Sequence, residues 1–161
     1  EPGGGGVARS GEHPDRAQPV SLAHRLADVL SVHPALVILS MVHEGEPMGK
    51  ARPRFNRRTR AVYTPKATAA REQAIGLLAK GQLRASPPAG FAVGVRVEFH
   101  VRRRGRYDLD NLLKLVLDGL NKIAWRDDRQ VCEVIAWKAL HSARPRTEIV
   151  VYALAGQVVL V

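Results

Sequence analysis

The segment from Phe91 to Val101, FAVGVRVEFHV, constrains the fold more than any other part of the chain. Every odd position in it is apolar, whereas the even positions carry Ala, Gly, Arg, Glu and His. This alternation is typical of a strand that turns one face toward a hydrophobic core. The inward face would consist of Phe91, Val93, Val95, Val97, Phe99 and Val101. We therefore expect a sheet whose apolar face is covered by another layer.

Two segments are predicted to form helices that supply this layer. Residues 109–124 repeat leucine, valine and isoleucine at helical spacing, with polar residues on the opposite face. Residues 66–81 form the second predicted helix, because Thr64-Pro65 suits a helix start and Gly81 suits a helix end. The expected apolar stripe of this second helix is Ala70, Ala74, Leu77 and Leu78.

Three further strands complete the expected sheet. Residues 35–45 and 131–140 are apolar enough to form strands, as are residues 147–154, and we expect the last two strands to pair as a hairpin across residues 141–146. The basic, proline-containing segment 46–65 shows no apolar period and is predicted to be a loop. The order β-α-β-α-β-β predicts an α+β domain, in which two helices pack on one face of a small mixed sheet.

The domain is expected to occupy residues 36–161. Residues 1–35 are rich in glycine and proline and are expected to be disordered or weakly helical, with a short helix over residues 21–30. The chain has 161 residues and a formal net charge of +10, which favours polyanionic partners, nucleic acid first. No apolar stretch is long enough to span a membrane, and the single cysteine, Cys132, fits a reducing, cytosolic setting.

Acidic residues gather at both ends of the predicted helix 109–124. Asp108 and Asp110 lie at its start, and Asp127 and Asp128 follow it. These acids have a structural interpretation, in which Asp108 is a helix cap, Asp110 a favourable first-turn acid, and the Asp127-Asp128 pair part of a turn. The alternative is chemical, because carboxylates that converge at one edge of a sheet can hold Mg²⁺ for phosphodiester hydrolysis. Zinc is not expected, since Cys132 is alone and the six histidines are scattered.

The block RRRGRYDLDNLLKLVLDGLNKIAWRDDRQV resembles the RusA family of Holliday junction resolvases. The features that match are a basic strand end, Asp-x-Asp-Asn, a Lys, a further Asp, and an aromatic residue before Asp-Asp. In this chain they are Asp108, Asp110, Asn111, Lys114, Asp118, Trp125, Asp127 and Asp128. The upstream segment GEPMGKARPRF is also similar to the family pattern, and the resemblance covers residues about 41 to 154.

The resemblance implies a homodimeric, Mg²⁺-dependent endonuclease that cuts two opposed strands of a four-way DNA junction; Mn²⁺ can substitute as the cofactor. It implies that Asp108, Asp110 and Asp128 are the catalytic carboxylates and metal ligands, and that Lys114 assists at the phosphate. Asn111, Asp118 and Asp127 match the pattern in a secondary role.

Basic residues on both sides of this block are expected to form a rim that contacts the DNA backbone. They are Lys50, Arg52, Arg54, Arg102, Arg103, Arg104 and Arg106. Two alternatives stay open: a related Mg²⁺ nuclease that acts on flaps or RNA, and a DNA-binding module without catalysis. The expected location is the cytoplasm of a bacterium, where the protein is nucleoid-associated or encoded by a phage.

Overall fold

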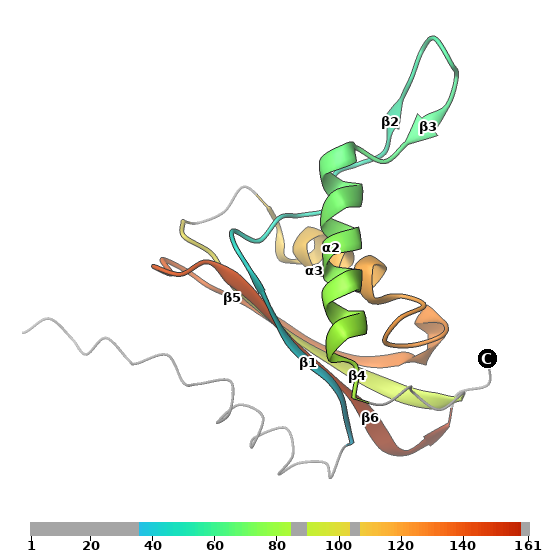
Figure 1. Cartoon of the computed structure of the whole chain (residues 1–161), viewed down its shortest axis with the longest axis vertical. Helices are drawn as coiled ribbons and strands as arrows, with labels where there is room; N and C mark the ends of the chain where they lie inside the picture. Colours follow the sequence, from blue (N-terminus) through green and yellow to red (C-terminus); the bar gives the residue numbers. More distant parts are fainter. Residues whose placement is uncertain (1–35, 85–89, 104–106, 159–161) are drawn as a thin grey trace, which may run out of the picture.

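A computed structural model describes residues 36–84, 90–103 and 107–158 of the chain. The expected N-terminal extension and its short helix lie outside these residues. Four strands form one mixed sheet in the order β1-β6-β4-β5 (Figure 1). Their bounds are β1 Val37–Glu44, β4 Phe91–His100, β5 Val131–Ala139 and β6 Arg146–Val158. β6 runs antiparallel to both β1 and β4, and β5 runs parallel to β4, which confirms the expected mixed α+β architecture.

The predicted hairpin between the last two strands is wrong. β6 lies between β1 and β4, while β5 pairs only with β4 at the edge of the sheet. The side chains explain this order, because Ile149, Val150, Val151 and Tyr152 of β6 are all buried and therefore suit a central strand covered on both faces. β5 is parallel to β4 because the helix between them carries the chain back across the sheet.

The alternation predicted for residues 91–101 is confirmed. Val93, Val95, Val97 and Phe99 belong to the main core between the sheet and the helices. The even-numbered face is also covered in part. The Tyr152 ring packs over Gly94 of β4, and the Tyr152 hydroxyl donates a hydrogen bond to Glu133 on β5. Burial and this hydrogen bond raise the pKa of Tyr152 above its usual range.

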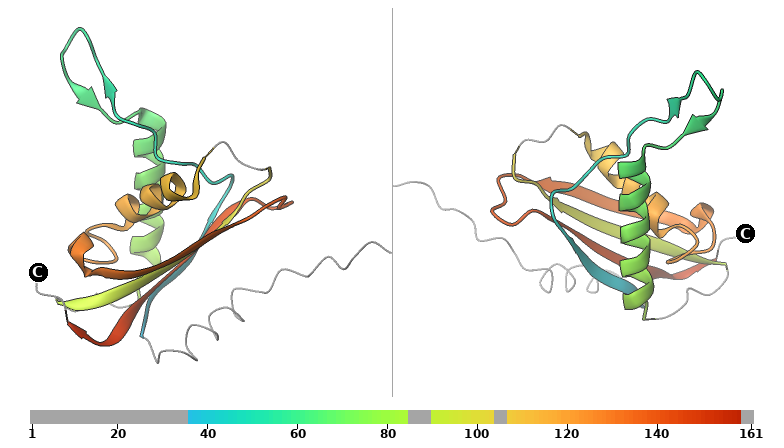
Figure 2. Two further views of the ribbon diagram at one scale, coloured as in Figure 1. Left: turned by 180° about the vertical axis from the view of Figure 1, so that it is seen from behind. Right: turned by 45° about the horizontal axis from the view of Figure 1, so that its top comes forward.

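Both helices lie on one face of the sheet, as expected (Figure 2). They are α2, Lys66–Gln82, and α3, Leu109–Leu120. They cross at two glycines: a Cβ on Gly119 would lie 3.0 Å from the backbone oxygen of Glu72, and a Cβ on Gly76 would lie 3.0 Å from the backbone oxygen of Gly119. Small residues at the crossing therefore allow the two backbones to approach closely.

The apolar stripe predicted for α2 is wrong for three of its four residues, because only Leu78 packs against the core. Leu77 is 61% exposed, and Ala70 and Ala74 are exposed as well. The buried face instead contains Ile75, Gly76 and Ala79, together with Thr68. The glycine crossing determines this rotation, because the face that carries Gly76 is the one that fits against α3.

α3 ends four residues earlier than predicted. Asn121 has an extended ψ of 138° and Lys122 a positive φ of 64°, so neither residue continues the helix. The chain then turns through residues 121–127 into a short 3₁₀ helix, η1, Asp128–Gln130. Ala124 and Trp125 of this turn are buried in the core, which gives the turn a fixed position under the pocket described below.

The segment 46–65 is not a simple loop. Strands β2, Arg54–Phe55, and β3, Val62–Tyr63, pair as an antiparallel hairpin. Asn56 organises its tip, since its Oδ1 accepts hydrogen bonds from the backbone N–H groups of Arg58 (2.9 Å) and Thr59 (3.2 Å). We call residues 52–63 the arm; Figure 1 shows its hairpin projecting beyond the start of α2.

Candidate active site

An open pocket lies between α3, η1 and β5. Its apolar walls come from Leu113, Leu117, Val131 and Val134. Its polar lining consists of Asp110, Lys114, Asp118 and Asp128. The first three of these polar residues follow one another at intervals of four, so α3 presents them along one side, and the turn after α3 delivers the fourth.

Asp128 is held at both carboxylate oxygens. Trp125 donates its indole N–H to Oδ1 at 3.0 Å, and Asn121 donates its amide N–H to Oδ2 at 3.0 Å. Trp125 is only 1% exposed, so its indole is fixed by the core. The carboxylate itself stays exposed and faces the pocket, with each oxygen retaining lone pairs for a further partner.

Asp127 serves the local fold. Its side chain accepts the backbone N–H of Arg129 at 3.0 Å and caps η1, while the Gln130 side chain closes the capping box. The Arg129 guanidinium, 3.0 Å away, holds the pKa of Asp127 below its usual value. The structural interpretation, in which the Asp127-Asp128 pair forms part of a turn, therefore explains Asp127 but not Asp128.

Gln130 is a buried residue that the sequence did not single out. Its Oε1 accepts the backbone N–H groups of Arg126 (2.9 Å) and Asp127 (3.2 Å), and its Nε2 donates to the Phe91 carbonyl at 3.0 Å. Gln130 is fully buried and ties the turn that bears Asp128 to the start of β4. The Asp-x-x-Gln spacing of a capping box was the signal that could have revealed it.

Asp118 is bound by two lysines. Lys50 forms an ion pair with Asp118 and a second one with Glu72 at 2.9 Å, and Lys114 lies 3.4 Å from Asp118. Partial burial alone would lower the pKa of Lys50, but the hydrogen bonds to both carboxylates outweigh it and raise that pKa. Lys50 is therefore a cation that links the chain before the arm to both helices.

The start of α3 is exposed. Asp108 occupies the N-cap position, yet its side chain makes no capping hydrogen bond, so the capping role predicted by the structural interpretation is not seen. Asp108 is not among the residues that line the pocket. Asn111 is half-buried, and its backbone oxygen accepts the N–H of Lys50 at 2.9 Å, which fastens the segment before the arm to α3.

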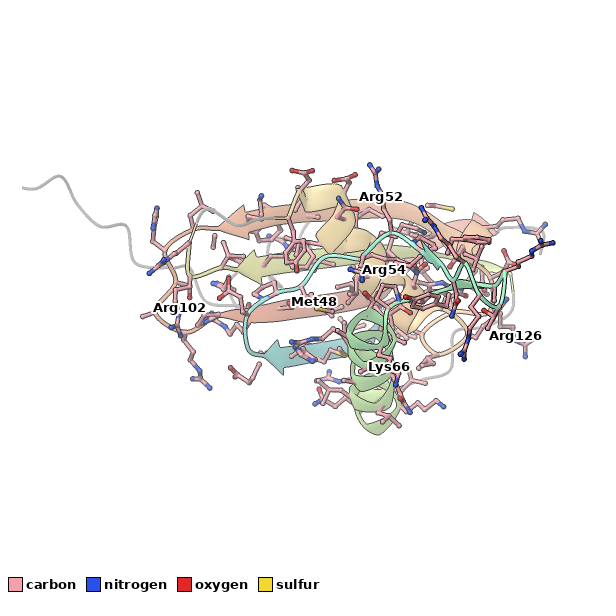
Figure 3. The ribbon with its side chains drawn as sticks, turned by 90° about the horizontal axis from the view of Figure 1, so that it is seen from above. Met48, Arg52, Arg54, Lys66, Arg102 and Arg126 are labelled. Carbon is pink, nitrogen blue, oxygen red and sulfur yellow. The ribbon has the colours of Figure 1, made fainter. Side chains whose placement is uncertain are left out.

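The predicted basic rim is spread over the molecule. Arg52 and Arg54 are exposed on the arm, and Arg102 and Arg103 are exposed at the end of β4. Figure 3 places Arg102 at the opposite end of the domain from the arm. Arg104 and Arg106 lie outside the described residues.

The comparison with protein families matches residues 44–152 to the family described as endodeoxyribonuclease RusA. The match spans the sheet from the end of β1 to the middle of β6 and includes the whole pocket. The chain belongs to the RusA endodeoxyribonuclease family. A search of curated proteins finds no match to it.

Membership in the RusA family confirms the resemblance found in the sequence and implies endodeoxyribonuclease activity of the kind that resolves Holliday junctions. Within this RusA domain the fold brings Asp110, Lys114 and Asp128 to one pocket, together with Asp118. It leaves Asp108 at the exposed helix start and uses Asp127 as a cap. In the described part of the chain, no helix is long and apolar enough to cross a membrane.

The pocket carboxylates suit a hard cation in their chemistry. Mg²⁺ is bound by oxygen ligands and usually keeps several of its waters, so a few carboxylates facing one open pocket fit its needs. Asp108, Asp110 and Asp128 are not, however, among the residues whose ligand atoms already cluster in the described part of the chain. The fit therefore rests on the donor types and on the shared pocket, with water completing the shell.

A tighter group of potential ligands occurs elsewhere in the RusA domain. Ligand atoms of Glu98, His100 and Glu148 all lie within 4.8 Å of one another, and all three residues are buried. They lie on the sheet face that points away from the helices, and Arg146 Nε donates to Glu148 at 2.7 Å. Alternation along β4 put Glu98 and His100 on one face, but the sequence did not reveal Glu148 beside them because this requires the β4–β6 pairing.

Proposed function

We propose that this RusA-family chain is a Mg²⁺-dependent endodeoxyribonuclease that resolves four-way DNA junctions in recombination and repair, and that it acts as a homodimer. The observation that carries the proposal is the convergence of Asp110, Asp118 and Asp128 with Lys114 on one open pocket. In a chain with a net charge of +10, a group of carboxylates is unfavourable for DNA binding alone and is useful for phosphodiester hydrolysis.

Each polar residue of the pocket has a proposed role. Asp110 and Asp128 are metal ligands, joined by Asp108 from the exposed start of α3. When bound, Mg²⁺ supplies activated water and stabilises the charge on the phosphate oxygens. Lys114, whose side chain is 64% exposed, is free to reach the scissile phosphate and neutralise part of its charge.

Asp118 has a different role in this scheme. Its ion pairs with Lys50 and Lys114 already balance its charge, so we place it as the residue that positions both lysines. Asn111 holds the segment before the arm through its backbone oxygen, and Asp127 caps η1 through its side chain. The single cysteine, Cys132, is exposed on β5, and its free thiol agrees with a cytoplasmic setting in a bacterium or a phage-infected cell.

The test of the function is cleavage of labelled substrates in the presence of Mg²⁺ or of EDTA. The substrates are a four-way junction, a 5′ flap, a duplex, a single strand and an RNA hairpin. We expect paired, symmetric cuts in the junction only when the metal is present. Cleavage of the flap or the RNA in preference to the junction would establish the related-nuclease alternative, and no cleavage of any substrate would establish the binding module.

Substitution of the carboxylates tests the site. Asp110→Asn and Asp128→Asn should abolish cleavage while junction binding is retained or tightens, because each change removes a charge that repels phosphate. Glu44→Gln is the matched control, since Glu44 is an exposed acid that pairs with Arg144 at the end of β1. Full cleavage by the Asp110→Asn protein would refute the role given to this pocket.

A further inference from the structure

The arm carries a concentration of positive charge without acidic neighbours. Its exposed arginines are Arg52, Arg54, Arg57, Arg58 and Arg60. The sequence contains no Asp or Glu between Glu46 and Glu72, and within the described residues no ion pair involves any of these arginines. Uncompensated charge on a projecting element creates a positive field that attracts a polyanion.

The arm also exposes apolar side chains that have no core to join. Phe55 is 59% exposed, Val62 69% and Tyr63 45%. Phe55 pairs across the hairpin with Val62, and Arg54 pairs with Tyr63. One face of the hairpin therefore carries Phe55 and Val62, and the other face carries Arg54 and Tyr63. A solvated loop needs none of these side chains, whereas a ring beside arginines is the combination on which nucleic acid bases stack.

The base of the arm is fixed to the active site. Lys50, just before the arm, pairs with Asp118 in the pocket and with Glu72 of α2, and its backbone N–H bonds to Asn111 of α3. Pro65, just after the arm, is the N-cap of α2. The direction of the arm is therefore set by the same two helices that build the pocket.

We propose that the arm is a branch-point reader, in which the arginines bind phosphates of the DNA arms and the Phe55 ring stacks on a base exposed where the strands exchange. In an intact duplex the faces of the bases are covered by their neighbours, so stacking is available only where pairing or stacking is interrupted. The arginines supply affinity that carries no sequence information. Phe55 then supplies the preference for branched DNA over duplex, which deepens the junction specificity proposed above and rests on that proposal.

The test compares binding of junction and duplex in EDTA, so that it does not depend on cleavage. Phe55→Ala should weaken junction binding by about fivefold to a hundredfold, the loss expected for one stacked base, and leave duplex binding unchanged. A 2-aminopurine base beside the branch point should change its fluorescence with the wild-type protein and not with Phe55→Ala. Leu77→Ala is the matched control, because Leu77 is 61% exposed on α2 outside the arm.

The arginines give a separate readout. The triple variant Arg57→Gln, Arg58→Gln, Arg60→Gln should weaken junction and duplex binding alike. It should also reduce the slope of log affinity against log salt by about 0.9 for each phosphate that the arm no longer neutralises. Weaker binding of the junction with unchanged binding of the duplex would contradict the general phosphate-binding role given to these arginines.

Two results would overturn the proposal. The first is a junction-to-duplex affinity ratio of Phe55→Ala equal to that of the wild type. The second is a Phe55→Ala protein whose sedimentation shows a broken dimer, since the ring would then be covered by a second copy of the chain. Failure of the wild type to cut junctions, with the Phe55 effect on binding intact, would reject the nuclease function and leave the arm's role in binding standing.

Discussion

Asp128 depends on two neighbours that touch neither DNA nor metal in our scheme. The Trp125 indole and the Asn121 amide each donate to one oxygen of its carboxylate, both at 3.0 Å. Asn121 Oδ1 is itself buried without a hydrogen-bond partner in the described part of the chain. The contact with Asp128 is therefore the hydrogen bond that holds the Asn121 side chain in place. Partners of this kind orient a ligating carboxylate, and removing them typically lowers metal affinity or activity by about 10- to 100-fold.

Trp125→Phe and Asn121→Ala should therefore raise the Mg²⁺ concentration needed for half-maximal cleavage and lower the rate, by about tenfold or more each. Direct binding of Mn²⁺, measured by titration without DNA, should weaken in parallel. Junction binding in EDTA should stay unchanged. A variant that was merely unfolded would lose this binding as well.

Trp137→Phe is the control for this experiment. Trp137 lies on β5, where Arg96 stacks over its ring, so it belongs to the sheet face that points away from the pocket. An equal shift in Mg²⁺ requirement in this control would mean that the tryptophan effect is general and not a property of the Asp128 contact.

At the scale of elements, periodicity predicted most of the fold. The alternation in residues 91–101 and the helical spacing after Leu109 depend on neighbours within one segment, and both elements are confirmed. The strand order could not be read in the same way, because only the burial of β6 on both faces shows that it belongs in the centre. The arm was missed since its two strands have two residues each, too short to show a period.

The candidate site was predictable to a similar degree. The spacing of Asp110, Lys114 and Asp118 on one helix face follows from the sequence alone. The bond of Lys50 to Asp118 joins residues 68 positions apart and depends on how α2 crosses α3, which no local pattern encodes. Asn121 gave no signal either, because its role arises from a helix that stops four residues early.

The glycine crossing gives a prediction for stability. Gly119→Ala places a Cβ 3.0 Å from the backbone oxygen of Glu72 and 3.1 Å from the Ile75 side chain, so the helices must separate. We expect a decrease of about 1–3 kcal/mol in the free energy of unfolding, measured by urea denaturation. Gly81→Ala is the control, since a Cβ there meets nothing within 4 Å, and it should be neutral or stabilise α2 by up to ~1 kcal/mol. Equal stability of the two variants would show that the crossing is not tight.

At the scale of the whole molecule, the proposed function lets the carboxylate pocket of one chain make one cut, while a four-way junction needs two opposed cuts. Closed two-fold pairing supplies two identical sites. Over residues 146–152 β6 is bonded to both β1 and β4, so this strand offers no free edge there for pairing. The edges of the described sheet are β1 and β5, and β5 exposes Ile135 at 40%.

We expect sedimentation at micromolar concentration to give a species of twice the 17.6 kDa chain mass. Mixing wild type with excess Asp110→Asn protein should then convert a cruciform plasmid to the nicked form, because a mixed dimer cuts one strand only. Linear product that persists undiminished in the mixture, or a monomer that makes paired cuts, would contradict the dimer.

The central position of β6 has a consequence for synthesis. β1 emerges from the ribosome first, but its hydrogen-bonding partner is β6, which is made more than a hundred residues later. At about 5–20 residues per second, β1 and β4 wait for several seconds or longer before the strand between them exists. Until then their edges are open to foreign strands, so we expect the sheet to form only once β6 has been made and newly made chains to need chaperones at high expression.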